Sequence, residues 1–525
     1  MPLHASEIAA PTGMAAPAVK AFARRDSTWH LPALLLGASA YLALNLFRFF
    51  QAPFLLSGDQ IFFWMFAQRM LGGEKIYRDF FQYTPPGTDL IYLALFKLFG
   101  PHIWVTNAIV FALGLALCWI CFSVAKEIMD RSSAALAAAL FLVLIYGKLL
   151  SGTHYLFSAL AIMCAVKVMM TETTPARSLG AGVLLGLASF FTQSHGAIAL
   201  LGMLLVLACE AINARGLLPS RVRASALLLL GYSAALLLLS AHWIASEGVP
   251  RLWHFQVTYV REYLNLGDSG GFLGLPPLTG KHAALKLSQY VAVYLLVATV
   301  YPLTLWRCWE ERKNPRAFIK RPALLLVIGT VLLLAMASNP NWLRVYTASM
   351  PAVILFIWLV TSGRLKRRAV LATIWAAIGC LTVSQIVGRY RTQSTIVRLP
   401  AGAAAVEPLA SDKLVWMMHH SAPGGYFFQA AWPGFYLPLA LRNPAYLESV
   451  EPSDRLTPAD VSALIDRLDE KQVAYVQWPQ RLDHPNQTAN GSQDNIQPLS
   501  NYLHTHYTVV KVFADGDSIL KRNSD

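Results

Sequence analysis

Two aspartates that follow the first apolar run are the residues best suited to acid–base chemistry. Asp59 comes shortly after the apolar run 31–50, and Asp79 lies in an aromatic segment further on. A carboxylate in such a place can accept a proton from a hydroxyl or amine nucleophile. Each acid also has a structural interpretation. Asp59 can favour the start of a helix, and Asp79 can pair with Arg78 or Lys75.

Three arginines supply the cations that a phosphate group would need. Arg344 begins an apolar run, while Arg251 and Arg261 share a loop rich in aromatic residues. A guanidinium group binds phosphate oxygens in bidentate fashion. The alternative for Arg344 is that its side chain extends to the lipid headgroups.

Other polar residues border the same apolar runs. Tyr83 stands before a Pro-Pro-Gly turn, Gln193 and His195 share a very short turn, and His154 begins an apolar run. We predict that Tyr83 and Gln193 bind substrate, with satisfied helix-end polar groups as the alternative for Gln193. His154 is a candidate metal ligand or an ordinary interfacial histidine.

The cysteines give little support for a metal or redox centre. Cys118 and Cys121 form a Cys-x-x-Cys pattern inside an apolar run, with no second pair of ligands. We interpret both as small residues of helix packing.

The composition requires lipid as the solvent for most of this chain. It has 525 residues, of which 55% are hydrophobic and 14% charged, and its mean hydropathy is +0.45. A single soluble core cannot hide so much apolar surface. The formal net charge is +14, but the basic residues do not gather into one domain or stripe, so we predict no nucleic-acid partner.

Apolar runs long enough to cross a bilayer predict about eleven transmembrane helices. The segment 86–100 is shorter, holds Asp89 and Lys97, and is predicted to be a juxtamembrane helix. The predicted spans are 31–49, 103–125, 133–147, 154–171, 178–193, 196–213, 224–245, 286–306, 322–338, 345–361 and 369–387.

The distribution of basic residues orients these spans. With segment 86–100 kept on one side, most basic loops share the side of the N-terminal segment 1–30, which the positive-inside rule places in the cytoplasm. The short loops on the other side hold little more than Lys148 and Arg344. The predicted transmembrane domain is therefore 31–388, with external loops 51–102 and 246–285 and an external domain 389–525.

The tail after residue 389 has the pattern of a small α/β domain. A Thr-Pro-Ala-Asp start predicts a helix over 457–471, and a strand follows at 473–477. The segments 507–513 and 518–521, joined by a turn, predict a hairpin. The polar segment 485–498 is predicted to be a mobile loop. The predicted fold class is thus an all-α polytopic membrane protein with a small C-terminal α/β extramembrane domain.

The first external loop resembles one family. An acid after the first span, an interfacial helix, an aromatic and glycine-containing stretch, and a Pro-Pro turn into an apolar helix ending in Phe-Gly are similar to the integral-membrane glycosyltransferases of the GT-C superfamily. The resemblance is to bacterial relatives of protein mannosyltransferases and of the lipid A aminoarabinose transferase. It rests on Asp59, the helix to Leu71, Gly73, Tyr77, Pro85-Pro86 and Phe99-Gly100.

The resemblance implies an activity and a mechanism. The enzyme would move a sugar from a polyprenyl-phosphate donor to a lipid, glycan or protein acceptor at the outer face of the bacterial inner membrane. Asp59 would be the general base, with Asp79 as a second catalytic acid, and cations would stabilise the phosphate left behind. Many relatives have a second acid where this chain has Gln60, so the use of a divalent metal as cofactor is an open question.

Two other classes fit the same topology. A polytopic transporter or flippase would also have many spans, although it would carry polar groups near mid-membrane. A non-catalytic partner in cell-envelope polysaccharide assembly would not depend on Asp59.

Overall fold

The computed structural model describes most of the chain, and the statements below refer to that part. The predicted N-terminal segment and most of the 266–285 part of the second loop lie outside it. The described residues are 29–49, 51–213, 215–265, 283–311, 320–336, 342–362, 367–451, 456–483 and 495–524.

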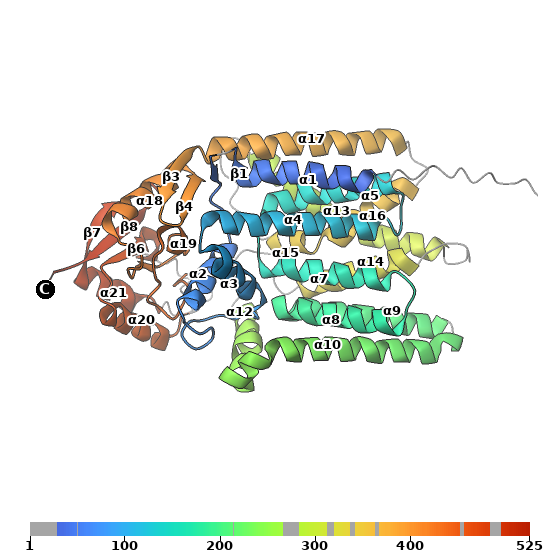
Figure 1. The fold of residues 1–525 in the computed structure, drawn as a ribbon, viewed down its shortest axis with the longest axis horizontal. Coiled ribbons are helices and arrows are strands. Elements are labelled where there is room, and N and C mark those ends of the chain that lie inside the picture. The colour runs from blue at the N-terminus through green and yellow to red at the C-terminus, as the bar shows by residue number, and fades with distance from the viewer. Residues whose placement is uncertain are drawn as a thin grey trace, which may run out of the picture.

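The apolar helices lie side by side in one bundle, with their axes running roughly along the same direction (Figure 1). Six stretches are long and apolar enough to cross a membrane: α4 (Ile103–Ala125), α5 (Arg131–Leu140) continued by η1 (Phe141–Tyr146) and α6 (Gly147–Leu149), α9 (Gln193–Asn213), α10 (Leu218–Glu247), α13 (Ala283–Glu311) and α17 (Arg367–Thr392). Five are shorter: α1 (His30–Leu46), α7 (His154–Met169), α8 (Pro175–Phe191), α14 (Lys320–Ala335) and α16 (Met350–Ser362). Each corresponds to one predicted span.

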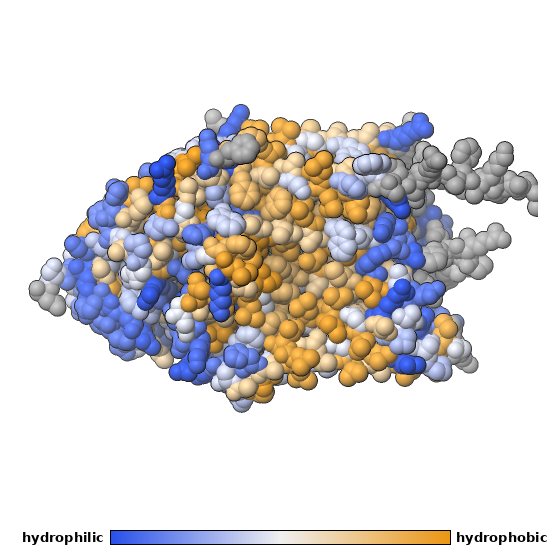
Figure 2. All heavy atoms as spheres, viewed as in Figure 1, coloured by the Kyte–Doolittle hydropathy of each residue, from blue (hydrophilic) through white to orange (hydrophobic). Residues whose placement is uncertain are grey.

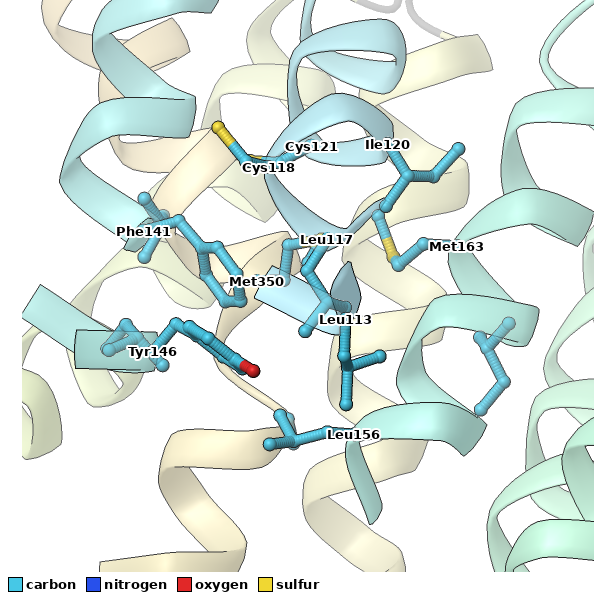
Figure 3. Close-up of a cluster of buried hydrophobic side chains, with 14 of the residues drawn as sticks. Leu113, Leu117, Cys118, Ile120, Cys121, Phe141, Tyr146, Leu156, Met163 and Met350 are labelled. Atoms are coloured by element: carbon cyan, nitrogen blue, oxygen red, sulfur yellow. The ribbon is translucent and has the colours of Figure 1, made fainter. Parts of the chain in front are cut away.

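The surface of the bundle has the pattern of a membrane protein. Figure 2 shows a broad hydrophobic band around the helices, bordered on both sides by hydrophilic residues. The interior is apolar as well. Cys118 and Cys121 of α4 lie buried among side chains such as Phe141 and Met350 (Figure 3), as expected for packing residues.

One predicted span is wrong in its boundary. The prediction placed a single helix over 345–361, but the structure has a short helix α15 (Trp342–Thr347) and then α16, whose second residue is Pro351. Proline lacks an N–H and disfavours helical conformation in the residue before it, so a helix readily begins there rather than continuing through. Arg344 therefore lies on its own short helix.

Two helices separate the bundle from the C-terminal residues: α2 (Gln60–Leu71) and α3 (Gly87–Phe99). They follow a small hairpin of β1 (Phe47–Arg48) and β2 (Ala52–Pro53). The position of α3 agrees with the predicted juxtamembrane helix (Figure 1). An interfacial helix is expected to turn its polar side chains to solvent, but Arg69 of α2 is only 7% exposed.

The second external loop begins with helical turns. After α10 come α11 (Val249–Trp253), the π-helical η3 (His254–Tyr259) and α12 (Val260–Asn265), and a 3-10 turn η2 (Arg215–Leu217) precedes α10.

The residues after α17, called here the C-terminal domain, combine helices with a mixed sheet. Strand order in the four-stranded sheet is β5-β6-β8-β7, with β5 and β6 parallel and the other pairs antiparallel. The elements are β3 (Thr395–Leu399), β4 (Gly402–Val406), α18 (Pro408–His420), β5 (Phe428–Gln429), α19 (Tyr436–Leu439), α20 (Pro458–Glu470), β6 (Tyr475–Pro479), η5 (Gln480–Leu482), α21 (Gln497–His506), β7 (Tyr507–Val512) and β8 (Asp517–Arg522).

Most predictions for this domain hold. Thr457 caps α20 through a capping box, and β7 and β8 form the predicted hairpin. The strand predicted at 473–477 lies two residues later, as β6, and α17 continues past the predicted domain boundary at 389. Most of the loop predicted at 485–498 lies outside the described residues, and its end belongs to α21.

The C-terminal domain is joined to the loops at one end of the bundle, called here the domain-side end. Main-chain N–H groups of Leu55, Phe81 and Ile103 donate to carbonyl oxygens of the domain at 2.9, 2.9 and 3.1 Å. One buried hydrophobic cluster contains residues from the first loop, the second loop and the domain. Backbone bonds and a shared core thus fix the loops that carry the candidate site.

Candidate active site

Asp59 occupies the N-cap position of α2, but its side chain makes no capping hydrogen bond. The capping bond of the structural interpretation is therefore absent, although an acid in this position still interacts favourably with the dipole of α2. Burial raises the pKa of Asp59 above its usual range, while the nearby charge of Arg344 acts in the opposite direction.

The neighbouring Gln60 holds Asp59 in place. The amide of Gln60 is 1% exposed; it donates to the carbonyl oxygens of Ser57 (2.9 Å) and Leu150 (3.3 Å) and accepts from the N–H of Gly152 (3.0 Å). A second acid at this position could not make all these bonds, because a carboxylate only accepts. Gln60 therefore fastens the start of α2 to the segment that leads into α7.

Three of the polar residues lie within electrostatic reach of one guanidinium, that of Arg344. The positive charge of Arg344 interacts electrostatically with Asp59, His154 and His195, which lie in three other parts of the chain. His154 Nδ1 lies 2.9 Å from the Thr192 hydroxyl. The structure thus brings the predicted acid, the predicted cation and the predicted histidine together at the domain-side end.

Lys148 adds a second cation near this group. Its Nζ lies 5.1 Å from the ring centroid of Tyr290. That ring packs against Trp342 and Tyr346 of α15, at centroid distances of 5.3 and 5.9 Å, and α15 also carries Arg344. Our site prediction did not include Lys148, although the sequence signal was the same as for Arg344: a basic residue on the side with few of them.

The donor atoms do not fit a metal centre. In the described part of the chain, no group of three or more His, Cys, Asp or Glu side chains is arranged to hold a metal ion. His154 already uses one ring nitrogen toward Thr192. The prediction of His154 as a ligand stays untested, and no step below depends on a metal.

The predicted substrate residues Tyr83 and Gln193 are joined to the second loop. Gln193 Nε2 donates to the Tyr83 carbonyl (3.4 Å) and to the Gln256 carbonyl (3.0 Å). Gln256 Nε2 donates in turn to the Tyr77 hydroxyl at 3.1 Å. One amide at the start of α9 therefore connects the first loop with η3.

Tyr77 is the junction of this network, and only the family resemblance had singled it out. It has a φ of 69°, in the left-handed region that non-glycine residues rarely adopt. Its hydroxyl donates to the Thr84 carbonyl (2.9 Å), and its own carbonyl accepts from the Tyr446 hydroxyl (3.1 Å). Such conformations persist where the surroundings fix them and often lie at functional sites.

Aromatic rings surround the junction. Phe81 packs edge-on against Tyr259 at 4.8 Å, and Tyr83 lies 5.9 Å from the same Tyr259 ring. Tyr77 stacks on Phe255 at 5.8 Å. The π-helical turn η3 supplies both partners, and such turns are frequent at functional sites.

The remaining predicted residues lie apart from this group. The exposed Asp79 pairs with Arg78, whose Nε lies 3.7 Å from Asp79 Oδ1, as in the structural interpretation of that acid, and it also accepts from the backbone N–H of Lys75 at 2.8 Å. Arg251 forms an ion pair with Glu247 (3.0 Å) at the end of α10, and Arg261 is exposed on α12. Among the described residues, no interaction joins these three side chains to Asp59.

Comparison of the sequence alone gives nothing: no model of a known family and no curated protein matches it. Solved structures do match. The chain is similar to ArnT from Cupriavidus metallidurans bound to undecaprenyl phosphate, with a TM-score of 0.56 and 13% identity over 95% of this chain and 99% of that one.

Two archaeal structures are also similar. The apo oligosaccharyltransferase of Archaeoglobus fulgidus has a TM-score of 0.53 and 12% identity, over 87% of this chain and 70% of that one. The oligosaccharyltransferase AglB from the same organism, in complex with an inhibitory peptide and a dolichol-phosphate, has a TM-score of 0.52 and 13% identity, over 92% and 72%.

These structures are all GT-C glycosyltransferases, and the likeness extends over nearly the whole chain. Identities this low compare folds rather than activities. The chain is therefore a multi-pass membrane protein that shares the fold of these structures, the fold that the resemblance in residues 51–102 implied.

Proposed function

We propose that this protein is a glycosyltransferase that moves a sugar from a polyprenyl-phosphate donor to an acceptor outside the cytoplasm. The observation that carries the proposal is the electrostatic interaction of Asp59 with Arg344 at the domain-side end of a GT-C fold. Two structures of that fold hold an undecaprenyl phosphate and a dolichol-phosphate, which supports a lipid-linked donor.

The roles follow from charge and position. Arg344 binds the phosphate of the donor, and Lys148, whose Nζ lies over the Tyr290 ring that packs against α15, is a second cation that could oppose the charge developing on the leaving group. Asp59 accepts the proton of the acceptor hydroxyl or amine as its oxygen or nitrogen attacks the anomeric carbon. The bond from that carbon to the phosphate oxygen breaks, and polyprenyl phosphate leaves with the electron pair.

The electrostatic interaction between Asp59 and Arg344 supports the roles proposed for these two residues. When the donor is bound, its phosphate would pair with Arg344 and offset the effect of the Arg344 charge, which lowers the pKa of Asp59. The pKa of Asp59 would then rise, and its carboxylate would become a stronger base. Tyr83 and Gln193 are proposed to contact the sugar or the acceptor from the junction of the two loops. We further propose that the domain-side end faces the outside of the bacterial inner membrane, with the N-terminus in the cytoplasm.

The test is transfer of labelled sugar by purified protein from a panel of polyprenyl-phosphate sugars. The wild-type protein should transfer from at least one donor, and Asp59→Asn should lower kcat by about 100-fold or more, as expected for loss of a general base. Asp466→Asn, on the exposed face of α20, is the matched control. Equal rates for Asp59→Asn and wild type would remove Asp59 from the mechanism, and no transfer from any lipid-linked sugar would favour a transporter or a non-catalytic partner.

A further inference from the structure

A second buried acid, Asp89, lies in the first turn of α3. It is 0% exposed. Its Oδ2 accepts from Gln82 Nε2 at 3.2 Å, and its Oδ1 has no hydrogen-bond partner among the described residues. No ion pair with Asp89 occurs among those residues either. A carboxylate that is fully buried without a cation is costly, so the uncharged acid is the form that fits this place.

Gln82 connects Asp89 to the backbone on the other side of the Pro85-Pro86 turn. Its Oε1 accepts from the N–H of Tyr83 at 2.9 Å and from the N–H of Thr84 at 3.1 Å. One amide therefore joins the residues before the turn to the acid after it. The two prolines cannot supply N–H groups of their own, so this side-chain bridge replaces the main-chain bonds of an ordinary turn.

The far side of the turn is fixed by close packing. A Cβ atom at Gly87 would stand 2.6 Å from the Phe190 carbonyl oxygen, so the start of α3 lies directly against the end of α8. Tyr83 then has two connections. Its backbone is held by Gln82 from within, and its carbonyl accepts from Gln193 at 3.4 Å.

We propose that Asp89 is a positioning residue that acts through Gln82 to hold Tyr83 where the transferase site needs it. This rests on the proposed function for what Tyr83 does, but the geometry of the bridge does not. Asp89 itself is closed off from solvent and does not touch substrate.

The charged and titratable groups around Asp89 agree with an uncharged acid. Burial raises the pKa of Asp89 well above its usual range. If Asp89 were ionised, its charge would interact electrostatically with Tyr77 and Tyr92. On the helices packed against α3, the guanidinium of Arg69 in α2 is paired with Glu74 at 2.6 Å. The ring of His154 in α7 bonds to Thr192. Tyr155 follows His154 in the first turn of α7, and its ring packs against His154 and His195. The other titratable groups on these helices are the cysteines in mid-α4, Cys164 and Lys167 further along α7, and Arg177 at the other end of α8.

Amide hydrogen exchange over residues 82–89, measured by mass spectrometry on the full-length protein, tests the bridge. Asp89→Leu and Gln82→Leu should each raise exchange of the Tyr83 and Thr84 amides about tenfold, the effect of losing one net hydrogen bond. The double variant should go no further than either single one, because both remove the same bridge. Asp89→Asn, which keeps an acceptor for Gln82, should stay within about twofold of wild type. Asp466→Leu is the control.

The outcome separates this inference from the proposed function. Wild-type exchange in both leucine variants would overturn the bridge whatever the enzyme does. Should Asp89→Leu fail to fold, Gln82→Leu and Asp89→Asn carry the test, and loss of protection in Asp89→Asn would equally overturn it. With the bridge confirmed, sugar transfer should be lost in Asp89→Leu and rescued in Asp89→Asn. Absence of transfer in the wild type would count against the proposed function alone.

Discussion

Asp59 and Arg344 are far apart in the chain, yet each modifies the other's electrostatics. Asp59 stands at the N-cap of α2 without capping it, and Arg344 stands on a helix of six residues. Neither position is explained by helix capping, and the two residues interact electrostatically. A base of this kind works best when its pKa lies near the working pH, and burial moves that of Asp59 in this direction.

The pH dependence of transfer should report this balance. Asp59 must be ionised to accept a proton, so kcat/KM should rise with pH through the pKa of Asp59, at a pH above the value of about 3.9 for an exposed aspartate. Arg344 lowers that pKa, so in Arg344→Gln the acid limb should move to higher pH. A limb that stays in place or moves to lower pH would show that the two groups do not interact in solution.

Asp89 should affect stability in a direction set by its raised pKa. The folded protein holds the proton of Asp89 more tightly than the unfolded chain does. The stabilisation that this proton binding gives to the folded state is fully present below about pH 3.9, and it is lost as the pH rises through the pKa that Asp89 has in the folded protein. Asp89→Asn cannot ionise. The thermal unfolding temperature of Asp89→Asn should therefore rise relative to that of wild type as the pH increases. A constant difference between the two would mean that Asp89 does not titrate in that range.

At the level of helices, α8 and α10 pack against each other with their backbones very close together. Their contact uses Gly182 and Gly186, a small-xxx-small pattern, from α8 and Gly231 from α10. A Cβ at Gly182 would stand 2.2 Å from the Leu228 carbonyl oxygen, and one at Gly231 would stand 2.3 Å from the Leu179 carbonyl oxygen. The pair matters for the site because α8 ends beside Thr192 and α10 leads into the second loop.

Gly182→Ala should therefore destabilise the bundle by roughly 1–3 kcal/mol, the usual cost of overpacking. Gly180→Ala is a matched control two residues away, since nothing lies within 4 Å of its added Cβ. Unfolding in mixed detergent micelles measures both. Equal stability of the two variants would contradict the close approach of the helices.

The helices were predictable because lipid demands about twenty apolar residues for each crossing. That rule says nothing about breaks within a run, so the division at Pro351 was missed. The π-helical turn η3 was missed too, since it depends on contacts with Phe81 and Tyr83 from another loop. The strand β6 was placed two residues early because alternation does not define where pairing with β8 begins.

For the molecule as a whole, the C-terminal domain and the first loop share one core. Arg69 of α2 is one polar connection: it donates to the Ala445 carbonyl of the domain at 2.8 Å, pairs with Glu74, and lies 4.8 Å from the centroid of the Phe80 ring. The burial of Arg69 could not be read from the neighbouring sequence, because the domain residue that it contacts lies more than 300 residues later. Candidate site residues could be chosen from their position at span ends. Which of them meet, and that Asp79 does not, required the fold.

Arg69→Met keeps an apolar side chain beside Phe80 but removes the bond to the Ala445 carbonyl of the domain and the bonds to Glu74 and the Asp79 carbonyl. It should lower stability by about 2 kcal/mol, since buried acceptors lose a charged donor, and should expose the C-terminal domain to proteolysis. Arg78→Met is the control because Arg78 is 59% exposed. Proteolysis at the same rate in both variants would show that the domain is held without Arg69.

Affinity for undecaprenyl phosphate, measured on purified protein in detergent, tests the central claim most directly, because it needs neither the sugar nor the acceptor. Arg344→Gln should weaken binding about tenfold or more relative to wild type, as expected for loss of a charge-assisted contact with phosphate. Arg467→Gln, an exposed arginine of the C-terminal domain, should bind as wild type does. Equal affinity of wild type and Arg344→Gln would contradict a lipid-phosphate site at the domain-side end of the bundle.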